Sequence, residues 1–208
     1  MAVAEAPTRH DTGGEQQPEH SAMSVSMMGM YIFLASEVMF FGALFATYFY
    51  LFGAHPNGWP PVGTEPVHWF PIPWINTIIL ISSGVTCHFA SESMAHDNRR
   101  RFYLLMAATL FLGVFFEVGQ GFEFLTAKMS FTGSNEFSSA FFAMTGFHGA
   151  HVLGGLIFLG LITARALRGQ FNSKHHAAVA AATLYWHFVD VVWIFLFTIL
   201  YFAVTSGV

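Results

Sequence analysis

Five long stretches of apolar residues dominate this sequence, and each is long enough to cross a membrane as a helix. They cover residues 27–53, 73–94, 102–125, 138–164 and 177–204. About 20 apolar residues cross the roughly 30 Å hydrocarbon core of a bilayer. None of the 8 Lys and Arg residues lies in these stretches, and of the 12 Asp and Glu residues only five do: Glu37, Glu92, Glu117, Glu123 and Asp190. We therefore predict an all-α integral membrane protein with a bundle of five transmembrane helices over residues 27–204.

Two segments outside these stretches have distinctive compositions. Residues 1–26 have no apolar run and combine Pro, Gly and acidic residues, which is typical of a disordered tail. Residues 54–72 contain Trp59, Trp69 and most of the prolines in the chain. Proline stiffens the backbone, and tryptophan favours the membrane–water boundary. The sequence thus predicts a tail before the first span and an interfacial loop after it.

The basic residues predict the orientation of the chain. Five crossings place the N-terminus, the second loop and the fourth loop on one side of the membrane. That side carries seven basic residues: Arg9, Arg99, Arg100, Arg101, Arg165, Arg168 and Lys174. The opposite side carries only Lys128. Because cytoplasmic loops are enriched in Lys and Arg, we expect a cytoplasmic N-terminus and tail, an outer 54–72 loop and a C-terminus outside.

Several classes of function are disfavoured by the residue counts. Cys87 is the only cysteine, so the chain has no disulfide framework, CxxC motif or cysteine-ligated iron–sulfur cluster. The formal net charge of −4 does not provide the basic surface that nucleic acids require. No glycine-rich motif for nucleotide phosphates is found either.

Polar residues in the middle of the spans are the candidate functional residues. Glu37 lies ten residues into the first stretch, and His187 and Asp190 lie ten and thirteen residues into the fifth. His148 and His151 lie ten and thirteen residues into the fourth, which enters from the opposite side. At 1.5 Å per residue all five lie roughly 15–20 Å deep, and each i,i+3 pair shares a helix face. Ionisable groups at this depth need partners, so we predict that Asp190 pairs with His187.

These residues alone leave four interpretations open. Histidines and carboxylates could hold a metal, or His148 or His151 could ligate haem b together with His187. Glu37, the histidines and Asp190 could form a proton or ion path. Alternatively, each histidine simply fixes the helix packing through a hydrogen bond. His88, closer to the inner end of its span, has no evident partner.

Two further carboxylates differ in depth. Glu123 lies near the outer edge of the third span, where it can reach water. Glu117 lies deeper and requires either a hydrogen-bonding partner or a carboxyl group that stays protonated.

Seven short strings of residues occur in one order along the chain. They are Ser36–Phe41 (SEVMFF), Gly58–Pro61 (GWPP), Ser83–Thr86 (SGVT), Gln120–Phe124 (QGFEF), Thr145–Val152 (TGFHGAHV), Ser173–His176 (SKHH) and Tyr185–Trp193 (YWHFVDVVW). As an ordered set they resemble subunit III of the haem–copper terminal oxidases, closest to the cytochrome c oxidase type. The five spans match five-helix bacterial members, whereas seven-helix members have two more helices before them. Ala180 stands where mitochondrial members have glutamate, and Glu117 has no counterpart in the family pattern.

The resemblance implies an accessory subunit of an aerobic, proton-pumping oxidase in the bacterial plasma membrane. Haem and copper would lie in subunits I and II, and this chain would have no cofactor, catalytic residue or metal ligand of its own. It would pack on subunit I, protect it during turnover and support proton uptake. Membrane lipids would surround it, a bound phospholipid is compatible with the family, and cytochrome c would be a partner of the complex rather than of this chain.

The resemblance also assigns roles to individual residues. Glu37 matches an intramembrane carboxylate that reacts with hydrophobic carbodiimides. The remaining candidates match structural polar positions: His148, His151, His187, Asp190 and Glu123. Two alternatives from other classes are a haem b membrane anchor that oxidises quinol and an independent proton or ion transporter.

Overall fold

The structure, a computed structural model, consists of five long helices. It describes residues 25–55, 58–61, 64, 71–126, 135–172 and 176–203. The helices are α1 (Val25–Ala54), α2 (Ile72–Ala95), α3 (Arg99–Thr126), α4 (Glu136–Leu167) and α5 (Ala177–Phe197), which continues into the π-helical segment η1 (Thr198–Ala203). All five are long and apolar enough to cross a membrane, and no strand occurs in the described ranges. The predicted fold class, an all-α bundle of five spans, is confirmed.

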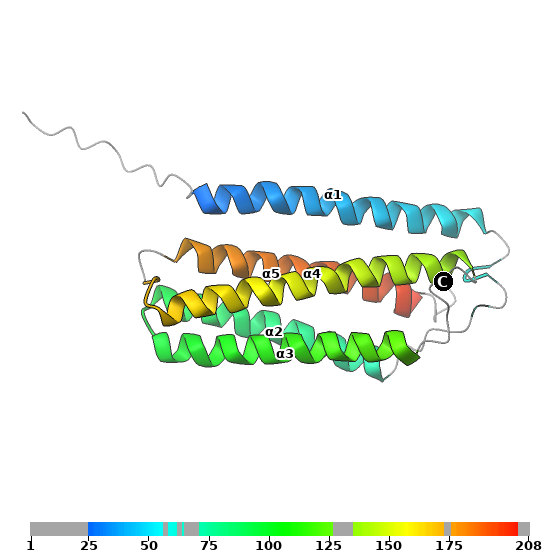
Figure 1. Cartoon of the computed structure of the whole chain (residues 1–208). Helices are drawn as coiled ribbons and strands as arrows, with labels where there is room; N and C mark the ends of the chain where they lie inside the picture. Colours follow the sequence, from blue (N-terminus) through cyan, green and yellow to red (C-terminus); the bar gives the residue numbers. More distant parts are fainter. Residues whose placement is uncertain are drawn as a thin grey trace, which may run out of the picture.

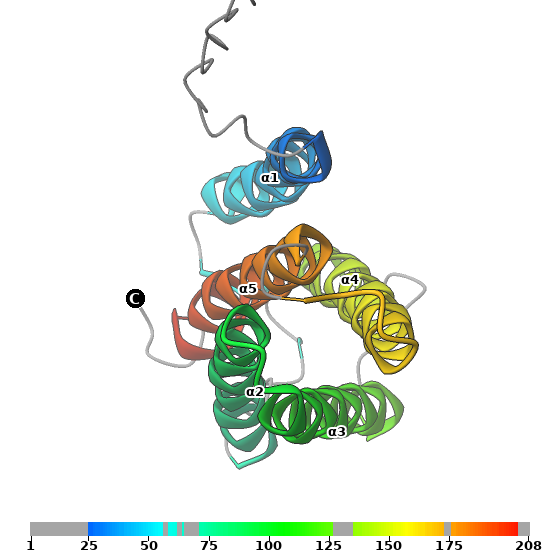
Figure 2. The same ribbon diagram turned by 90° about the vertical axis from the view of Figure 1, so that its left-hand side faces the viewer.

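The helices lie nearly side by side, with α1 at the edge of the bundle (Figure 1). Viewed from the end, α2, α3, α4 and α5 surround the core, whereas α1 covers the outer side of α5 and α4 (Figure 2). α2 and α3 form a hairpin joined by a short turn, and α2 also packs against α5. Most of the surface of α1 is therefore left open to lipid or to another protein.

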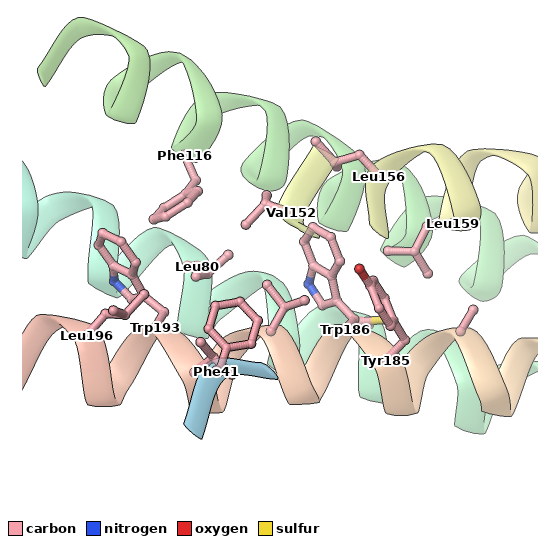
Figure 3. Packing of buried hydrophobic residues seen from close by; sticks show 14 of the residues in the cluster. Phe41, Leu80, Phe116, Val152, Leu156, Leu159, Tyr185, Trp186, Trp193 and Leu196 are labelled. Atoms are coloured by element: carbon pink, nitrogen blue, oxygen red, sulfur yellow. The ribbon is translucent and has the colours of Figure 1, made fainter. Parts of the chain in front are cut away.

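The core is built around two tryptophans of α5. Trp186 and Trp193 project from α5 into the space between α2, α3 and α4, where Trp193 lies edge-on to Phe116 (Figure 3). Both indoles are fully buried, and their Nε1–H groups donate hydrogen bonds to hydroxyls of α2: Trp186 to Ser83 and Trp193 to Thr77, each at 3.0 Å. A buried tryptophan needs such a partner for its polar edge, so these bonds fix the register of α5 on α2.

Local sequence signals explain several helix ends. α2 begins after Pro71 and carries Pro73 in its first turn, where no intrahelical N–H is required. α4 begins after Asn135, whose side chain accepts a hydrogen bond from the backbone N–H of Ser138. Beyond the end of α4, Gly169 adopts a φ of 75°, which glycine tolerates without strain.

Only parts of the two segments predicted outside the spans lie within the described residues. The tail over residues 1–26 lies almost entirely outside the described residues, and so does much of the 54–72 loop. Within the described part of that loop, Trp59 donates a hydrogen bond to the hydroxyl of Tyr48 at 3.0 Å and contacts Phe137 edge-on. This tryptophan therefore ties the loop to α1 and α4.

Candidate functional site: polar pairs within the spans

A hydrogen bond between Glu37 and His151 joins α1 to α4. The Oε2 atom of Glu37 lies 2.9 Å from Nε2 of His151, and the two side chains are only 17% and 18% exposed. The Nδ1 atom of the same imidazole lies 2.6 Å from the backbone carbonyl oxygen of Phe147, one helical turn earlier. Both ring nitrogens are thus engaged, and the ring is held between two helices.

This geometry determines where protons can sit. A carbonyl oxygen only accepts hydrogen bonds, so Nδ1 of His151 must carry a hydrogen. The Nε2 atom then either accepts the O–H of a neutral Glu37 or, in an imidazolium, donates to the carboxylate. In both arrangements the pair keeps one shared proton and has no net charge, which suits a site inside a membrane.

Aromatic side chains enclose the pair. The ring of Phe40 stacks on His151 with centroids 5.9 Å apart, and Phe41 meets it edge-on at 4.9 Å. The hydroxyl of Tyr185 from α5 donates to the backbone carbonyl of His151 at 3.0 Å. Three helices therefore converge on His151, and the rings of Phe40 and Phe41 cover its imidazole.

A second polar group lies between α5 and α2. The Nδ1 atom of His187 lies 3.6 Å from Oδ2 of Asp190, so the structure brings together the two residues that the sequence paired. The carboxylate of Asp190 fits against the backbone of α2 at Gly84, where an added Cβ would collide with it. Glycine at this position therefore makes room for a buried carboxylate.

Sequence reasoning missed the neighbour of His187 on α2. The ring of His88 lies against that of His187, with centroids 5.9 Å apart, although counting depth had left His88 without a partner. The sequence does contain a signal for this contact. Both residues are counted from the same membrane side, and their depths differ by only about three residues, or about 5 Å.

His148 has different surroundings from the other histidines. It is fully buried, stacks on Trp193 with centroids 5.1 Å apart, and meets Phe116 edge-on. Neither ring nitrogen has a hydrogen-bond partner in the described part of the chain. His151 is engaged with Glu37, and His187 faces His88, so the pairing of His148 or His151 with His187 that the haem interpretation needs is not formed.

The remaining intramembrane carboxylates occupy separate positions. Glu123 accepts a hydrogen bond from Nε2 of Gln120 at 3.4 Å and interacts with Tyr201. Glu117 is half-buried beside Gly149 of α4, and its Oε2 atom has no partner among the residues the structure describes. Within the same ranges, no three His, Cys, Asp or Glu side chains are grouped to hold a metal ion.

These features define a polytopic helical membrane protein that keeps carboxylate–imidazole pairs inside its spans. A family model described as cytochrome c oxidase subunit III matches residues 13–205. The cytochrome c oxidase subunit 3 of Thermostichus vulcanus is 44% identical over 186 residues, covering 88% of this chain and 89% of the relative. The protein of the same name from Myxine glutinosa is 38% identical over 195 residues, covering 90% and 74%. That from Aedes aegypti is 41% identical over 177 residues, covering 83% and 67%.

The chain therefore belongs to the cytochrome c oxidase subunit III family. The resemblance drawn from the seven strings is confirmed, and the haem b anchor is not favoured. Membership makes the chain part of a multi-subunit oxidoreductase and agrees with the five membrane-length helices.

Proposed function

We propose that the chain is the accessory, non-catalytic subunit III of an aerobic cytochrome c oxidase in a bacterial plasma membrane. Its N-terminus and the 1–26 tail lie in the cytoplasm, and the 54–72 loop and the C-terminus lie outside. It packs directly on subunit I, which with subunit II carries the haem and copper and receives electrons from cytochrome c. The family match and the distribution of basic residues support this assignment.

The observation that carries the functional part of the proposal is the Glu37–His151 pair. Its geometry accommodates one shared proton at mid-span, and its two side chains are only 17% and 18% exposed at the α1–α4 interface. The pair thus serves two purposes: it fixes α1 to α4, and it keeps a proton-bearing group within the membrane-spanning part of the oxidase. Through these two roles we expect the chain to stabilise subunit I and to support its proton uptake.

The other polar positions serve packing. His148 fills the core beside Trp193, whereas Asp190 and His187 occupy the α2–α5 interface. Glu123 interacts within the outer half of the bundle. We assign the redox chemistry of the oxidase to the partner subunits.

The test is purification of the oxidase through a tag on subunit I, with and without this chain. We expect the chain to copurify with the haem–copper core. The complex that lacks it should begin at a similar rate of oxygen consumption but lose activity after fewer turnovers. Absence of the chain from the purified core, or a stoichiometric b-type haem in the isolated chain, would overturn the proposal.

A further inference from the structure

The α2–α5 face of the bundle presents two imidazoles to its surroundings. His88 on α2 is exposed, and the side chain of His187 on α5 is 39% exposed. Their rings lie 5.9 Å apart between centroids, which places them as one polar patch on this face. Within the described chain no hydrogen-bonding group contacts the ring nitrogens of His88, and only Asp190 approaches His187.

The patch lies at the level of the hydrocarbon. His88 is seven residues from the end of α2 at Ala95, and His187 is ten residues from the start of α5 at Ala177. At 1.5 Å per residue these positions are about 10 and 15 Å inside the helix ends. The residues one turn away on the same face are apolar and exposed, namely Val85 and Val191.

A buried carboxylate lies behind the two imidazoles. Asp190 is buried, with Oδ2 3.6 Å from Nδ1 of His187 and Oδ1 without a partner in the described residues. The Nδ1 atom of His187 therefore faces this carboxylate and the backbone of α2 at Gly84, while 39% of the side chain stays exposed. A Cβ at Gly84 would collide with this carboxylate, so the sequence preserves the space that Asp190 needs.

Contact between these two imidazoles and lipid would cost free energy. Hydrocarbon chains offer no hydrogen bonds, and ionisable side chains within spans almost always face protein or a water-filled cavity. The exposed residues of α1 and α3 carry no comparable pair of imidazoles in the described ranges. Protein rather than lipid is therefore the occupant that fits the α2–α5 face.

We propose that a transmembrane helix of the oxidase's haem–copper catalytic subunit covers the α2–α5 face and supplies a hydrogen-bonding group to His88 and His187. The inference rests on the proposed function, because it assigns the face through which this subunit meets its partner. The surrounding valines give the apolar contact that a helix needs, and the imidazoles specify its position along the membrane normal.

The experiment places a photo-crosslinking benzoylphenylalanine at Val85 or at Val191, in the complete oxidase purified through the catalytic subunit. Val114 on α3 is the matched control, since all three valines are 51% exposed. After illumination, we expect covalent adducts with the catalytic subunit from Val85 and Val191, at least about tenfold above those from Val114. Adducts only with lipid or with a second copy of this chain, or adducts from Val114 in place of Val191, would overturn the assignment.

A second measurement tests the imidazoles themselves. Replacing His88 with Leu should make the chain dissociate from the purified complex at a lower detergent concentration. The apparent affinity of the chain for the complex should be about fivefold weaker, which is the effect of one lost hydrogen bond. A Val114→Leu variant is the control and should behave as wild type. Unchanged retention of the His88→Leu chain would count against the proposed hydrogen bond. Copurification of the unaltered chain with haem tests the proposed function separately, so the two failures are distinguishable.

Discussion

The bond between Glu37 and His151 should contribute a measurable coupling energy to the folded bundle. The two atoms lie 2.9 Å apart, and both side chains are more than four-fifths buried. Replacing Glu37 with Leu leaves Nε2 of His151 without a partner in an aromatic enclosure, which costs about 1–3 kcal/mol. Hydrogen bonds between helices in membranes average about 0.6 kcal/mol and reach about 1.7 kcal/mol. Because this bond shares a proton with a carboxyl group, we expect a coupling of about 1–2 kcal/mol.

The assay is a double-mutant cycle on the purified chain in mixed micelles, with Glu37→Leu, His151→Leu and the double variant. Tryptophan fluorescence follows unfolding, since Trp186 and Trp193 are buried in the core. The control cycle uses His55 and Glu136, which are also 2.9 Å apart but 29% and 57% exposed, and whose coupling should stay below about 1 kcal/mol. Additive effects at Glu37 and His151 within about 0.3 kcal/mol would refute the reasoning.

Three other substitutions test the polar groups separately. Glu37→Gln should leave assembly largely intact, because an amide can still donate to Nε2 of His151, but labelling by a hydrophobic carbodiimide should disappear; labelling that persists would place the reactive carboxyl elsewhere. Asp190→Leu should reduce the amount of assembled oxidase, since His187 loses the group that orients it, and normal assembly would contradict the pairing. Gly84→Ala should destabilise the bundle by about 1–3 kcal/mol in thermal unfolding, because its Cβ collides with Asp190; a smaller cost in an Asp190→Ala background would show that this contact is the cause.

The helices could be predicted from the sequence because their signal is strong and local. Long apolar runs without basic residues predict spans regardless of what the spans pack against. The pairing of His187 with Asp190 could also be predicted, since residues three positions apart on a helix share a face. Both features depend on one segment at a time, and the structure contains both.

Contacts between helices were harder to predict, because depth gives only one of three coordinates. Glu37, His151 and His187 lie at similar depth, yet only the first two meet, since they face each other across α1 and α4. His187 points instead towards His88, and His148 into the core beside Trp193. The angular position of each helix decides these partners, and it depends on the packing of the large indoles against small residues of neighbouring helices.

The attachment of α1 shows how polar groups can position a helix that buries little apolar surface. Between helices in a membrane there is no hydrophobic driving force, so specific contacts must set the register. Glu37 of α1 bonds to His151 of α4, and His55, directly after α1, bonds to Glu136 in the first turn of α4. In each case Nδ1 of the histidine is fixed by the carbonyl one turn earlier, so that Nε2 faces the glutamate.

The two bonds differ in which part of the chain supplies each group. Glu37 of α1 supplies the carboxylate in one bond, and His55, directly after α1, supplies the imidazole in the other. Their spacings along the two helices differ by only three residues. Glu37 and His55 are 18 residues apart, about 27 Å along a helix, and Glu136 and His151 are 15 residues apart, about 22 Å. In these antiparallel helices a slip of one turn, about 5.4 Å, would displace both pairs at once, so the two bonds together favour the observed register. These two pairs therefore fix α1 on α4 even though most of the surface of α1 remains open to its surroundings.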